Sequence, residues 1–479
     1  MKEFKTENGP HIKSNFNTTK MMRHLLIALL PLIIFSIYKN GYLPYSKGYG
    51  TLYDVFKPLL LIITGVLTSL ISEALFAKFI MDKKDINLKD YLKYSYAIFP
   101  GLFLALIVPI NTPLSVMIIG SLFATIVGKM LFGGFGYNVF NPALIGNLFI
   151  SSTYLSVITD LGGYLNKMEV DVTSGATPLS NLQSLNYIST YDKVVSTFGS
   201  LGDFFLGFIP GSVAETSALL CLIGLIYLII TKVVKWRIPV IYILTVFVLT
   251  SFIGLYNGLG IWYPLFHILS GGLMFGAIFM ATDPVTSPTT PYGQVIYALL
   301  LGLLTVIFRF LTSYPEGVLT AILTLNMLIF IIDKIGMKAR FDNKKIYISL
   351  IVILIVMSFT TFYISVNAGS KEKKDDTFKV INVETIDKDT IYTVSHKGSH
   401  GPIELVLTFD PTTNQIKEIE VLKQSEDVWT QIENNDYLNR LITNQNNIAD
   451  LDTISGATIT SNYLKQLVIK TINHYNENR

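Results

Sequence analysis

The chain has 479 residues, of which 51% are hydrophobic and only 15% are charged. Soluble proteins carry about 25% charged residues, so this shortfall and a mean hydropathy of +0.48 place most of the chain in a lipid bilayer. The formal net charge of +3 is small, and no basic run with interleaved aromatic residues points to nucleic acid.

Eleven apolar segments are candidates for membrane spans. The first follows a polar and basic N-terminus and has no small-residue cleavage site, so we expect a spanning helix there and not a signal peptide. The lone Cys221 lies in the sixth segment, and it excludes an internal disulfide and any zinc or iron–sulfur site built from this chain's own thiolates. The candidates lie near 24–39, 55–79, 95–111, 113–131, 138–158, 215–233, 238–256, 262–281, 294–312, 317–334 and 347–366.

Lysine and arginine residues concentrate in alternate connecting segments along the whole chain. By the positive-inside rule, this bias predicts a cytoplasmic N-terminus, with the loop 159–212 and everything after residue 367 on the other side of the membrane. Ten of the spans would form two five-helix halves of opposite orientation, as inverted repeats do.

The composition divides the chain into four parts. Residues 1–23 are expected to be a cytoplasmic segment, 24–335 a membrane domain, and 336–376 a membrane anchor followed by a charged linker. In 377–479, alternating apolar and polar residues predict strands, and Leu464, Leu467 and Ile472 recur at helical spacing. The predicted fold is therefore a polytopic α-helical membrane protein of ten plus one helices, with a small C-terminal α+β domain outside the cytoplasm.

The motif D-x-x-S-G-A-T occurs twice, at 171–177 and at 452–458. One interpretation is a turn or helix start, with Thr or Ser as the N-cap. The other is a modification site, in which small residues expose a hydroxyl and the acidic residue serves recognition. The predicted topology puts both copies in the same compartment, so that one enzyme could serve both.

The motif resembles the acceptor site at which a flavin transferase attaches FMN to threonine through a phosphoester. The resemblance implies covalent FMN on Thr177 and on Thr458. The surrounding motif residues would be Asp171, Ser174, Gly175 and Ala176 in the first copy, and Asp452, Ser455, Gly456 and Ala457 in the second.

Three further stretches, at 133–143, 210–219 and 280–293, resemble signatures of the D subunit of the Rnf complex and the B subunit of the related sodium-pumping quinone reductase. That family has ten membrane helices. The part beyond them is similar to the Rnf G subunit, one helix followed by an FMN-binding domain. The chain thus resembles a D–G fusion, although Q-S-E-D-V-W at 424–429 departs from the turn that the G subunit places near its flavin ring.

Several polar residues in or beside the spans are candidates for sites. Asn138 and Asn141 need partners at membrane depth, and the resemblance implies a non-covalent flavin, riboflavin or FMN, beside them. Thr282 and Asp283 are candidates for ligand or partner contacts, although Asp283 also suits a helix-end turn. Glu73 and Arg309 are candidates to pair or to line an ion path, with surface snorkelling or a purely structural pair as the alternatives. No metal site is expected, because the histidines do not cluster.

The resemblance implies an electron-transfer subunit of an Rnf-type complex that moves Na⁺ or H⁺ across the cell membrane and passes electrons from ferredoxin to NAD⁺. Its partners would be the other subunits of the complex, a flavin transferase and membrane lipid. Two alternatives remain open. One is a secondary transporter with an extracytoplasmic binding domain, and the other is flavin-based electron export to an extracellular acceptor.

Overall fold

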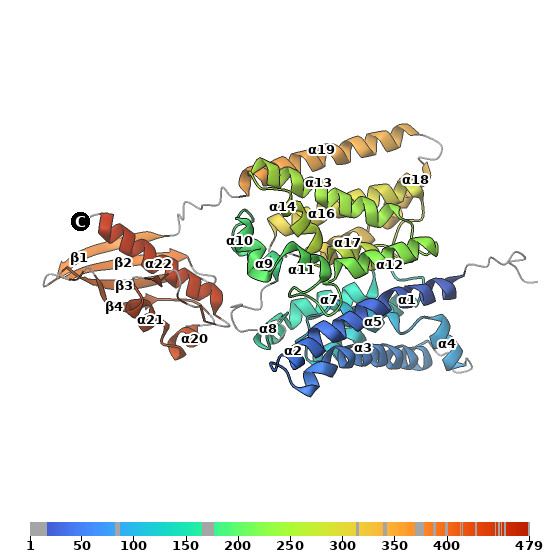
Figure 1. The fold of residues 1–479 in the computed structure, drawn as a ribbon, viewed down its shortest axis with the longest axis horizontal. Helices are drawn as coiled ribbons and strands as arrows, with labels where there is room; N and C mark the ends of the chain where they lie inside the picture. Colours follow the sequence, from blue (N-terminus) through green and yellow to red (C-terminus); the bar gives the residue numbers. More distant parts are fainter. Residues whose placement is uncertain are drawn as a thin grey trace, which may run out of the picture. The chain divides into compact units, whose positions relative to one another are not determined.

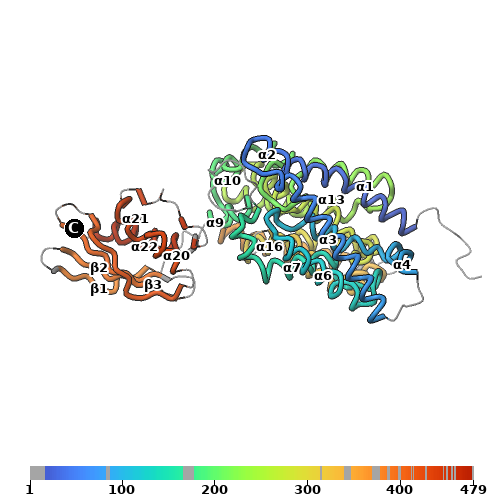
Figure 2. The backbone as a smooth tube through the Cα atoms, turned by 90° about the horizontal axis from the view of Figure 1, so that it is seen from below, coloured from blue at the N-terminus to red at the C-terminus, as the bar shows by residue number. Residues whose placement is uncertain are grey.

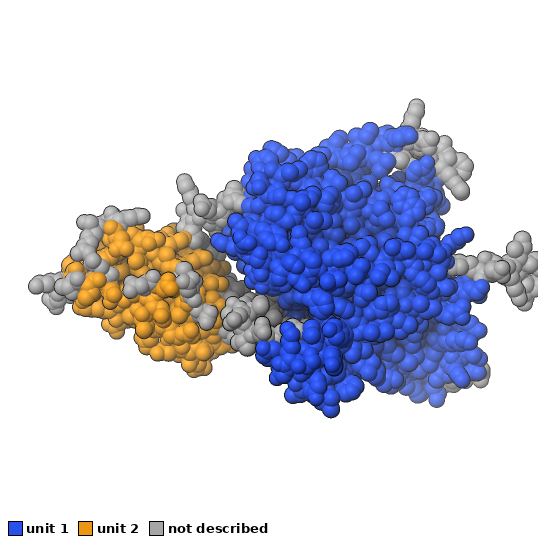
Figure 3. Space-filling model, in the orientation of Figure 1, with its two compact units in different colours: residues 1–369 blue, residues 370–479 orange. Residues whose placement is uncertain are grey.

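The structure is a computed structural model, and the chain divides into two compact units, Met1–Gly369 and Ser370–Arg479 (Figures 1 and 3). The structure describes residues 17–81, 87–164, 177–312, 316–338 and 343–368. It also describes 378–477, except for 387, 388, 398–400, 412, 414, 427, 428, 446, 449, 450, 452, 455 and 456. Of the two D-x-x-S-G-A-T motifs, Asp171, Ser174, Gly175, Ala176, Asp452, Ser455 and Gly456 lie outside the described residues.

In the described residues of the first unit the regular elements are helices, and two extended residues form one isolated bridge, Pro109 with Ser212. Its first part contains α1 (Thr18–Ile37), η1 (Tyr38–Tyr42), α2 (Leu43–Ser46), α3 (Leu52–Phe79), α4 (Leu88–Tyr94), α5 (Phe99–Ile107), α6 (Leu114–Ile126), η2 (Met130–Phe132), α7 (Pro142–Thr153) and α8 (Leu155–Asp160). Its second part contains α9 (Pro178–Ser184), α10 (Tyr191–Val194), η3 (Ser196–Phe198), α11 (Leu201–Leu206), α12 (Ala218–Ile230), α13 (Arg237–Tyr256), α14 (Trp262–Leu269), α15 (Leu273–Phe275), η4 (Gly276–Met280), α16 (Pro291–Leu311), α17 (Val318–Asn326), α18 (Ile329–Lys338) and α19 (Asn343–Asn367).

Among the described residues, six helical segments are long and apolar enough to cross a membrane, and two bent helix pairs raise this number to eight. All eleven expected segments contain apolar helix, but several are shorter than a full span. The pair α14 and α15–η4 bends by 63°, and α17 and α18 bend by 65°. Apolar composition does not show where a helix breaks, and the expected number of eleven spans stays a prediction. The inverted arrangement of two halves stays a prediction.

One break lets two distant segments pair through their backbones. After α5 the chain turns extended at Val108, and the segment before α12 lies against it. Val213 donates its amide hydrogen to the Val108 carbonyl at 3.0 Å, and Ala214 donates to Leu106 at 2.9 Å. Backbone groups that leave a helix inside an apolar environment need such partners, so this pairing makes the interruption of α5 tolerable.

Small residues bring helices into close contact. A Cβ atom on Gly101 of α5 would lie 1.9 Å from the carbonyl oxygen of Gly65 in α3. The two backbones therefore touch at a pair of glycines, as small residues allow in membrane helices.

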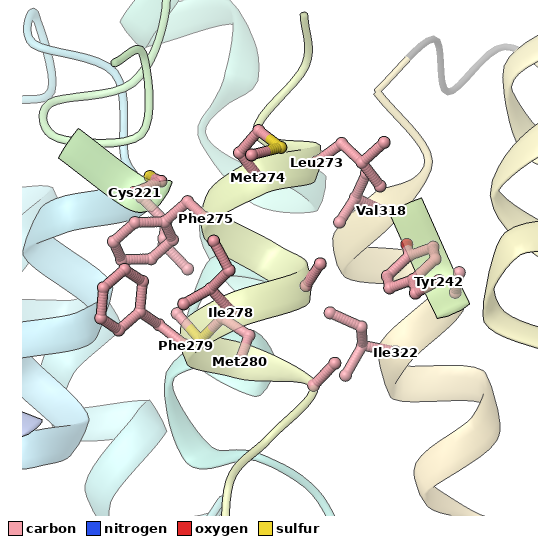
Figure 4. Packing of buried hydrophobic residues seen from close by; sticks show 14 of the residues in the cluster. Cys221, Tyr242, Leu273, Met274, Phe275, Ile278, Phe279, Met280, Val318 and Ile322 are labelled. Atoms are coloured by element: carbon pink, nitrogen blue, oxygen red, sulfur yellow. The ribbon is translucent and has the colours of Figure 1, made fainter. Parts of the chain in front are cut away.

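The core of this unit surrounds the segment 273–280, whose side chains are buried on all sides (Figure 4). Phe275 and Phe279 lie toward Cys221 of α12, whereas Leu273 lies toward Val318 of α17. A helical segment that is apolar all round is expected in the interior of a bundle and not at its surface.

The second unit is a four-stranded antiparallel sheet in the order β1-β2-β3-β4, with its helices on one face (Figure 2). The strands are β1 (Lys379–Ile386), β2 (Asp389–Lys397), β3 (Pro402–Asp410) and β4 (Gln415–Lys423), and the helices are α20 (Trp429–Asn434), α21 (Tyr437–Thr443) and α22 (Thr458–Glu477). Ile403, Leu405, Leu407 and Phe409 of β3 alternate toward a core that includes Leu464 and Leu467 of α22. The strand pattern and the final helix predicted from the sequence are confirmed.

Candidate functional sites

Thr177, the last residue of the first motif, is the N-cap of α9. Its backbone is extended (φ −70°, ψ 158°) and Pro178 follows at the first helical position, a combination that favours helix initiation. The Thr177 hydroxyl lies 3.0 Å from the Ser180 hydroxyl and accepts a weak hydrogen bond from the Ser180 amide at 3.4 Å. The helix-start interpretation of this motif is therefore correct for the described part, and it is compatible with a modified hydroxyl.

A carboxylate faces the same hydroxyl. Glu316, in the segment before α17, lies close enough to the Thr177 hydroxyl for that hydroxyl to lower the pKa of the carboxylate. The pKa of Glu316 lies above its ordinary value because burial raises it more than Arg309 and the Thr177 hydroxyl lower it. Any group attached to Thr177 would thus enter an environment that already contains an acidic side chain.

α9 rests on the break between α14 and α15. This break contains Gly271 and Gly272, both with positive φ (66° and 64°). A Cβ atom on Gly271 would lie 2.2 Å from a methyl carbon of Leu179 in α9. The positive φ of Gly271 favours glycine at this position, and a side chain there would also displace the Leu179 methyl group.

Arg309 holds the other side of this break. It is 1% exposed and donates to the carbonyl oxygens of His267 at 2.6 Å, Ser270 at 3.0 Å and Glu316 at 3.3 Å. The carbonyls at the C-terminal end of a helix carry partial negative charge, so the guanidinium group stabilises the end of α14. Arg309 does not pair with Glu73, as one hypothesis from the sequence held.

The second motif ends at the N-terminus of a longer helix. Thr458 is the first residue of α22, which has 20 residues, and Ala457 just before it is buried. The amide hydrogens at the N-terminus of a helix stabilise phosphate groups. Both predicted acceptor threonines therefore stand at the start of a helix.

The segment 424–429, which departs from the turn of the Rnf G subunit, is hydrogen-bonded to α22. The Thr460 hydroxyl donates to a Glu426 carboxylate oxygen at 2.7 Å, and both side chains are buried. Trp429 is also buried, and its indole nitrogen donates to Glu433 at 3.0 Å. The segment thus packs an acid and an aromatic ring close to the start of α22.

A pocket in the first unit brings together two of the stretches singled out in the sequence. We call it the Asn pocket. It is lined mainly by aromatic and apolar side chains, with Lys129, Asn138, Asn141 and Asp283 as its polar groups. The other lining residues are Met22, Leu25, Tyr96, Phe99, Pro100, Phe103, Phe135, Pro142, Ala143, Phe279 and Val285.

The candidate residues in the Asn pocket have local partners. Asn138 donates to the Phe140 carbonyl at 3.0 Å, and the Asn141 side chain accepts from the Ala143 amide at 3.1 Å as the N-cap of α7. Asp283 accepts from the Thr286 amide and hydroxyl at 3.1 and 2.8 Å, which fits its interpretation as a turn residue. Thr282 lines a smaller neighbouring pocket together with Asp283.

The lysine of the Asn pocket, Lys129, is part of a buried ion pair. Lys129 lies 2.6 Å from a carboxylate oxygen of Glu73 and also donates to the Ser95 carbonyl at 2.6 Å. The structural pair that the sequence left as an alternative for Glu73 is thus correct, with Lys129 as the partner.

The sequence did not identify Glu316 or the aromatic walls of the Asn pocket. Glu316 stands in a short polar segment with no motif around it, and the aromatic residues come from several helices. Among these walls, Phe135 lies in the recognised stretch 133–143, and its ring contacts Tyr96 at 4.8 Å between ring centres. In the part of the chain that the structure describes, no three His, Cys, Asp or Glu side chains gather as a metal site.

Comparison with known proteins identifies both units. A family model described as the NQR2, RnfD, RnfE family matches residues 5–342, and one described as the FMN-binding domain matches 398–473. The D subunit of the proton-translocating ferredoxin:NAD(+) oxidoreductase complex of Clostridium ljungdahlii is 34% identical over 346 residues, covering 71% of this chain and 97% of the relative.

Two other relatives agree with this result. The D subunit of the Na(+)-translocating ferredoxin:NAD(+) oxidoreductase complex of Acetobacterium woodii is 34% identical over 342 residues, covering 71% of this chain and 94% of the relative. The B subunit of the Na(+)-translocating NADH-quinone reductase of Chromohalobacter salexigens is 37% identical over 253 residues, covering 50% of this chain and 58% of the relative. The chain therefore belongs to the NQR2, RnfD, RnfE family, and an FMN-binding domain follows the family's membrane unit on the same polypeptide.

Proposed function

We propose that this chain is an electron-transfer flavoprotein subunit of an Rnf-type ion-translocating oxidoreductase in the cell membrane. FMN is attached by phosphoester bonds to Thr177 and to Thr458. The observation that carries this proposal is the placement of both threonines at the start of a helix, each at the end of a D-x-x-S-G-A-T motif. Bound flavin supplies one-electron transfer chemistry, and the protein sets its potential through hydrogen bonds and nearby charge.

The Asn pocket is our candidate for a third, non-covalent flavin, riboflavin or FMN. Its residues fit a flat, largely apolar ring system, because aromatic side chains form the walls and two amides, one lysine and one carboxylate supply the polar contacts. Asn138, Asn141 and Lys129 would bind the polar edge of the ring. Phe99, Phe135 and Phe279 would exclude water from it.

The proposed topology places the N-terminus in the cytoplasm and both covalent flavins on the opposite side. A linker near 367–376 would let the FMN-binding domain reach a donor and an acceptor in turn. The relatives are named as parts of larger complexes, so the partners of this chain would be the other Rnf-type subunits. A flavin transferase would be needed for maturation.

A secondary transporter with an extracytoplasmic binding domain is the alternative that one observation favours. The two bent helix pairs resemble the discontinuous helices that transporters use at their binding sites. Electron export to an extracellular acceptor would keep the flavins but not the complex. A transporter needs no covalent flavin, so counting FMN adducts separates it from the other two.

The test is to produce the full chain together with a flavin transferase and to measure in-gel flavin fluorescence and intact mass. Wild-type protein should carry two FMN adducts, whereas Thr177→Val and Thr458→Val should each carry one. The double variant should carry none.

Matched controls are Thr173→Val and Thr453→Val, which remove a neighbouring hydroxyl from the same two motifs. Both should keep two adducts. Wild-type protein without covalent FMN, or loss of an adduct in a control variant but not in the predicted acceptor variant, would refute the assignment of these threonines. Co-purification with Rnf-type subunits would separate the complex from electron export.

A further inference from the structure

Two carboxylates from different connecting segments meet at the break between α14 and α15. Glu215 precedes α12 and Glu316 precedes α17, and both lie against the two glycines of this break. A Cβ atom on Gly272 would lie 2.5 Å from Oε2 of Glu215, and a Cβ atom on Gly271 would lie 3.6 Å from the Glu316 Cα. The two glycines thus let both acids approach the same short stretch of backbone.

Glu215 is 8% exposed, and its two oxygens differ in their surroundings. Oε1 accepts a short hydrogen bond from the Ser212 hydroxyl, whereas Oε2 has no hydrogen-bond partner among the described residues. The hydroxyl of Ser270, in the break itself, is 1% exposed and likewise has no partner there. Buried polar oxygens are costly unless a donor or a cation satisfies them, so both atoms point to a ligand of positive charge.

The nearby cationic side chains are engaged elsewhere. Arg309 donates to the carbonyls of His267, Ser270 and Glu316, and it attracts the Glu316 carboxylate. Lys39 donates to the carbonyl of Ile209 and to the hydroxyl of Thr216. Within the described part of the chain, Oε2 of Glu215 therefore receives no hydrogen bond from either cation.

Flavin attachment would increase this excess of negative charge. The Thr177 hydroxyl lies near the Glu316 carboxylate and lowers its pKa. Replacing that hydroxyl hydrogen with a phosphoester removes a donor and adds an anion beside the carboxylate. A cation beside these negative groups would be bound strongly, because the low dielectric constant of a buried site strengthens electrostatic attraction.

We propose that Glu215 and Glu316 bind a single positive charge, carried by Na⁺ or by a proton, next to the Thr177 anchor. Oε2 of Glu215, the Ser270 hydroxyl and the Glu316 carboxylate are its oxygen ligands. Oxygen ligands of this kind suit a hard cation. The cation site itself depends only on the carboxylates, whereas its effect on a flavin rests on the proposed function.

The first experiment uses full-length protein made without a flavin transferase, with Na⁺ as the probe. Equilibrium binding of radioactive Na⁺ is measured at constant ionic strength, with choline chloride as the balancing salt. If Na⁺ occupies the site, binding to wild-type protein is saturable, and Glu215→Gln and Glu316→Gln weaken it about tenfold or more. Glu418→Gln, an exposed carboxylate of β4, is the matched control and should change nothing.

The second experiment tests the proton. Infrared difference spectra of the same protein between neutral and alkaline pH should show the carbonyl stretch of a protonated carboxylic acid. This band should be absent from Glu215→Gln or Glu316→Gln and present in Glu418→Gln. Either the sodium result or the proton result supports the proposal. If wild-type protein shows neither saturable Na⁺ binding nor such a band, the proposal is wrong, and this outcome does not depend on whether the variants fold.

The link to the flavin is measured separately in flavin-loaded Thr458→Val protein, whose covalent flavin would be on Thr177. Its midpoint potential should rise with Na⁺ concentration at constant pH, or, if the site takes a proton, rise more steeply with falling pH than the protons taken up by the flavin itself require. Glu215→Gln should remove the Na⁺ dependence or this extra pH dependence. If the cation binds and neither dependence is seen, the coupling to the flavin is refuted, but the cation site itself is not. Absence of FMN from Thr177 would refute the proposed function and leave the cation binding unaffected.

Discussion

Lys129 and Glu73 form an ion pair of 2.6 Å in the interior of the membrane unit, where the two side chains are 3% and 0% exposed. Removing one member of such a pair leaves a buried charge without compensation and typically costs about 3–5 kcal/mol. We expect Lys129→Met to lower the thermal stability of the detergent-purified protein accordingly.

Replacing both members should be much milder. The double variant Lys129→Met, Glu73→Leu should recover most of the loss, because it removes both charges together. Lys78→Met, an exposed lysine of the same helix as Glu73, should stay within about 0.5 kcal/mol of wild type. A single variant as stable as wild type would show that the pair is not buried as described.

The contact of Gly101 with Gly65 gives a second prediction. Gly101→Ala places a methyl group where the structure has 1.9 Å to a carbonyl oxygen, so α3 and α5 must separate. Overpacking of this kind costs about 1–3 kcal/mol, and thermal unfolding followed by size-exclusion chromatography would detect it. Gly202→Ala, in the exposed part of α11, is the control and should be neutral or slightly stabilising.

Arg309 should not tolerate replacement by lysine. A lysine keeps the charge but cannot present the planar set of donors that reaches three carbonyls. Hydrogen bonds from charged groups contribute about 1.5–3 kcal/mol each, so Arg309→Lys should lose about that amount or more. Arg237→Lys, at the start of α13, provides the comparison, and equal melting temperatures for the two variants would contradict the assigned role.

In the FMN-binding domain, Thr460→Val should weaken the attachment of segment 424–429 to α22. The lost hydrogen bond to Glu426 involves two buried side chains, and about 1.5–3 kcal/mol is expected. Limited proteolysis of the full chain should cleave this domain faster in Thr460→Val than in Thr460→Ser, which keeps the hydroxyl. Identical cleavage rates would argue against a stabilising role of the bond.

Local patterns in the sequence predicted much of the fold. The alternation in β3 and the helical spacing after the second motif are short-range signals, and both elements appear where expected. Apolar composition alone did not predict the broken spans, although Ser270, Gly271 and Gly272 are residues that tend to interrupt a helix. Their bend depends on Arg309, which comes from another helix.

The candidate sites, too, could be predicted from the sequence only where a local motif marks them. Asn138 and Asp283 were singled out from their motifs, but only the fold shows that 133–143 and 280–293 line one pocket together with Met22 and Phe99. No sequence motif around Glu316 marks it as a site residue. Its position beside Thr177 results from the packing of α9 on the α14–α15 break, a contact between segments that are far apart in the chain.

The burial of the single native thiol has a practical consequence. Cys221 is 0% exposed among core residues, so maleimide reagents applied to folded protein should leave it unlabelled. A pair of cysteines introduced at surface positions of α10 and α22 would then accept spin labels without prior mutation of the background. Pulsed electron paramagnetic resonance on such a pair would report how far apart the two units stand, and whether that separation changes when electrons arrive.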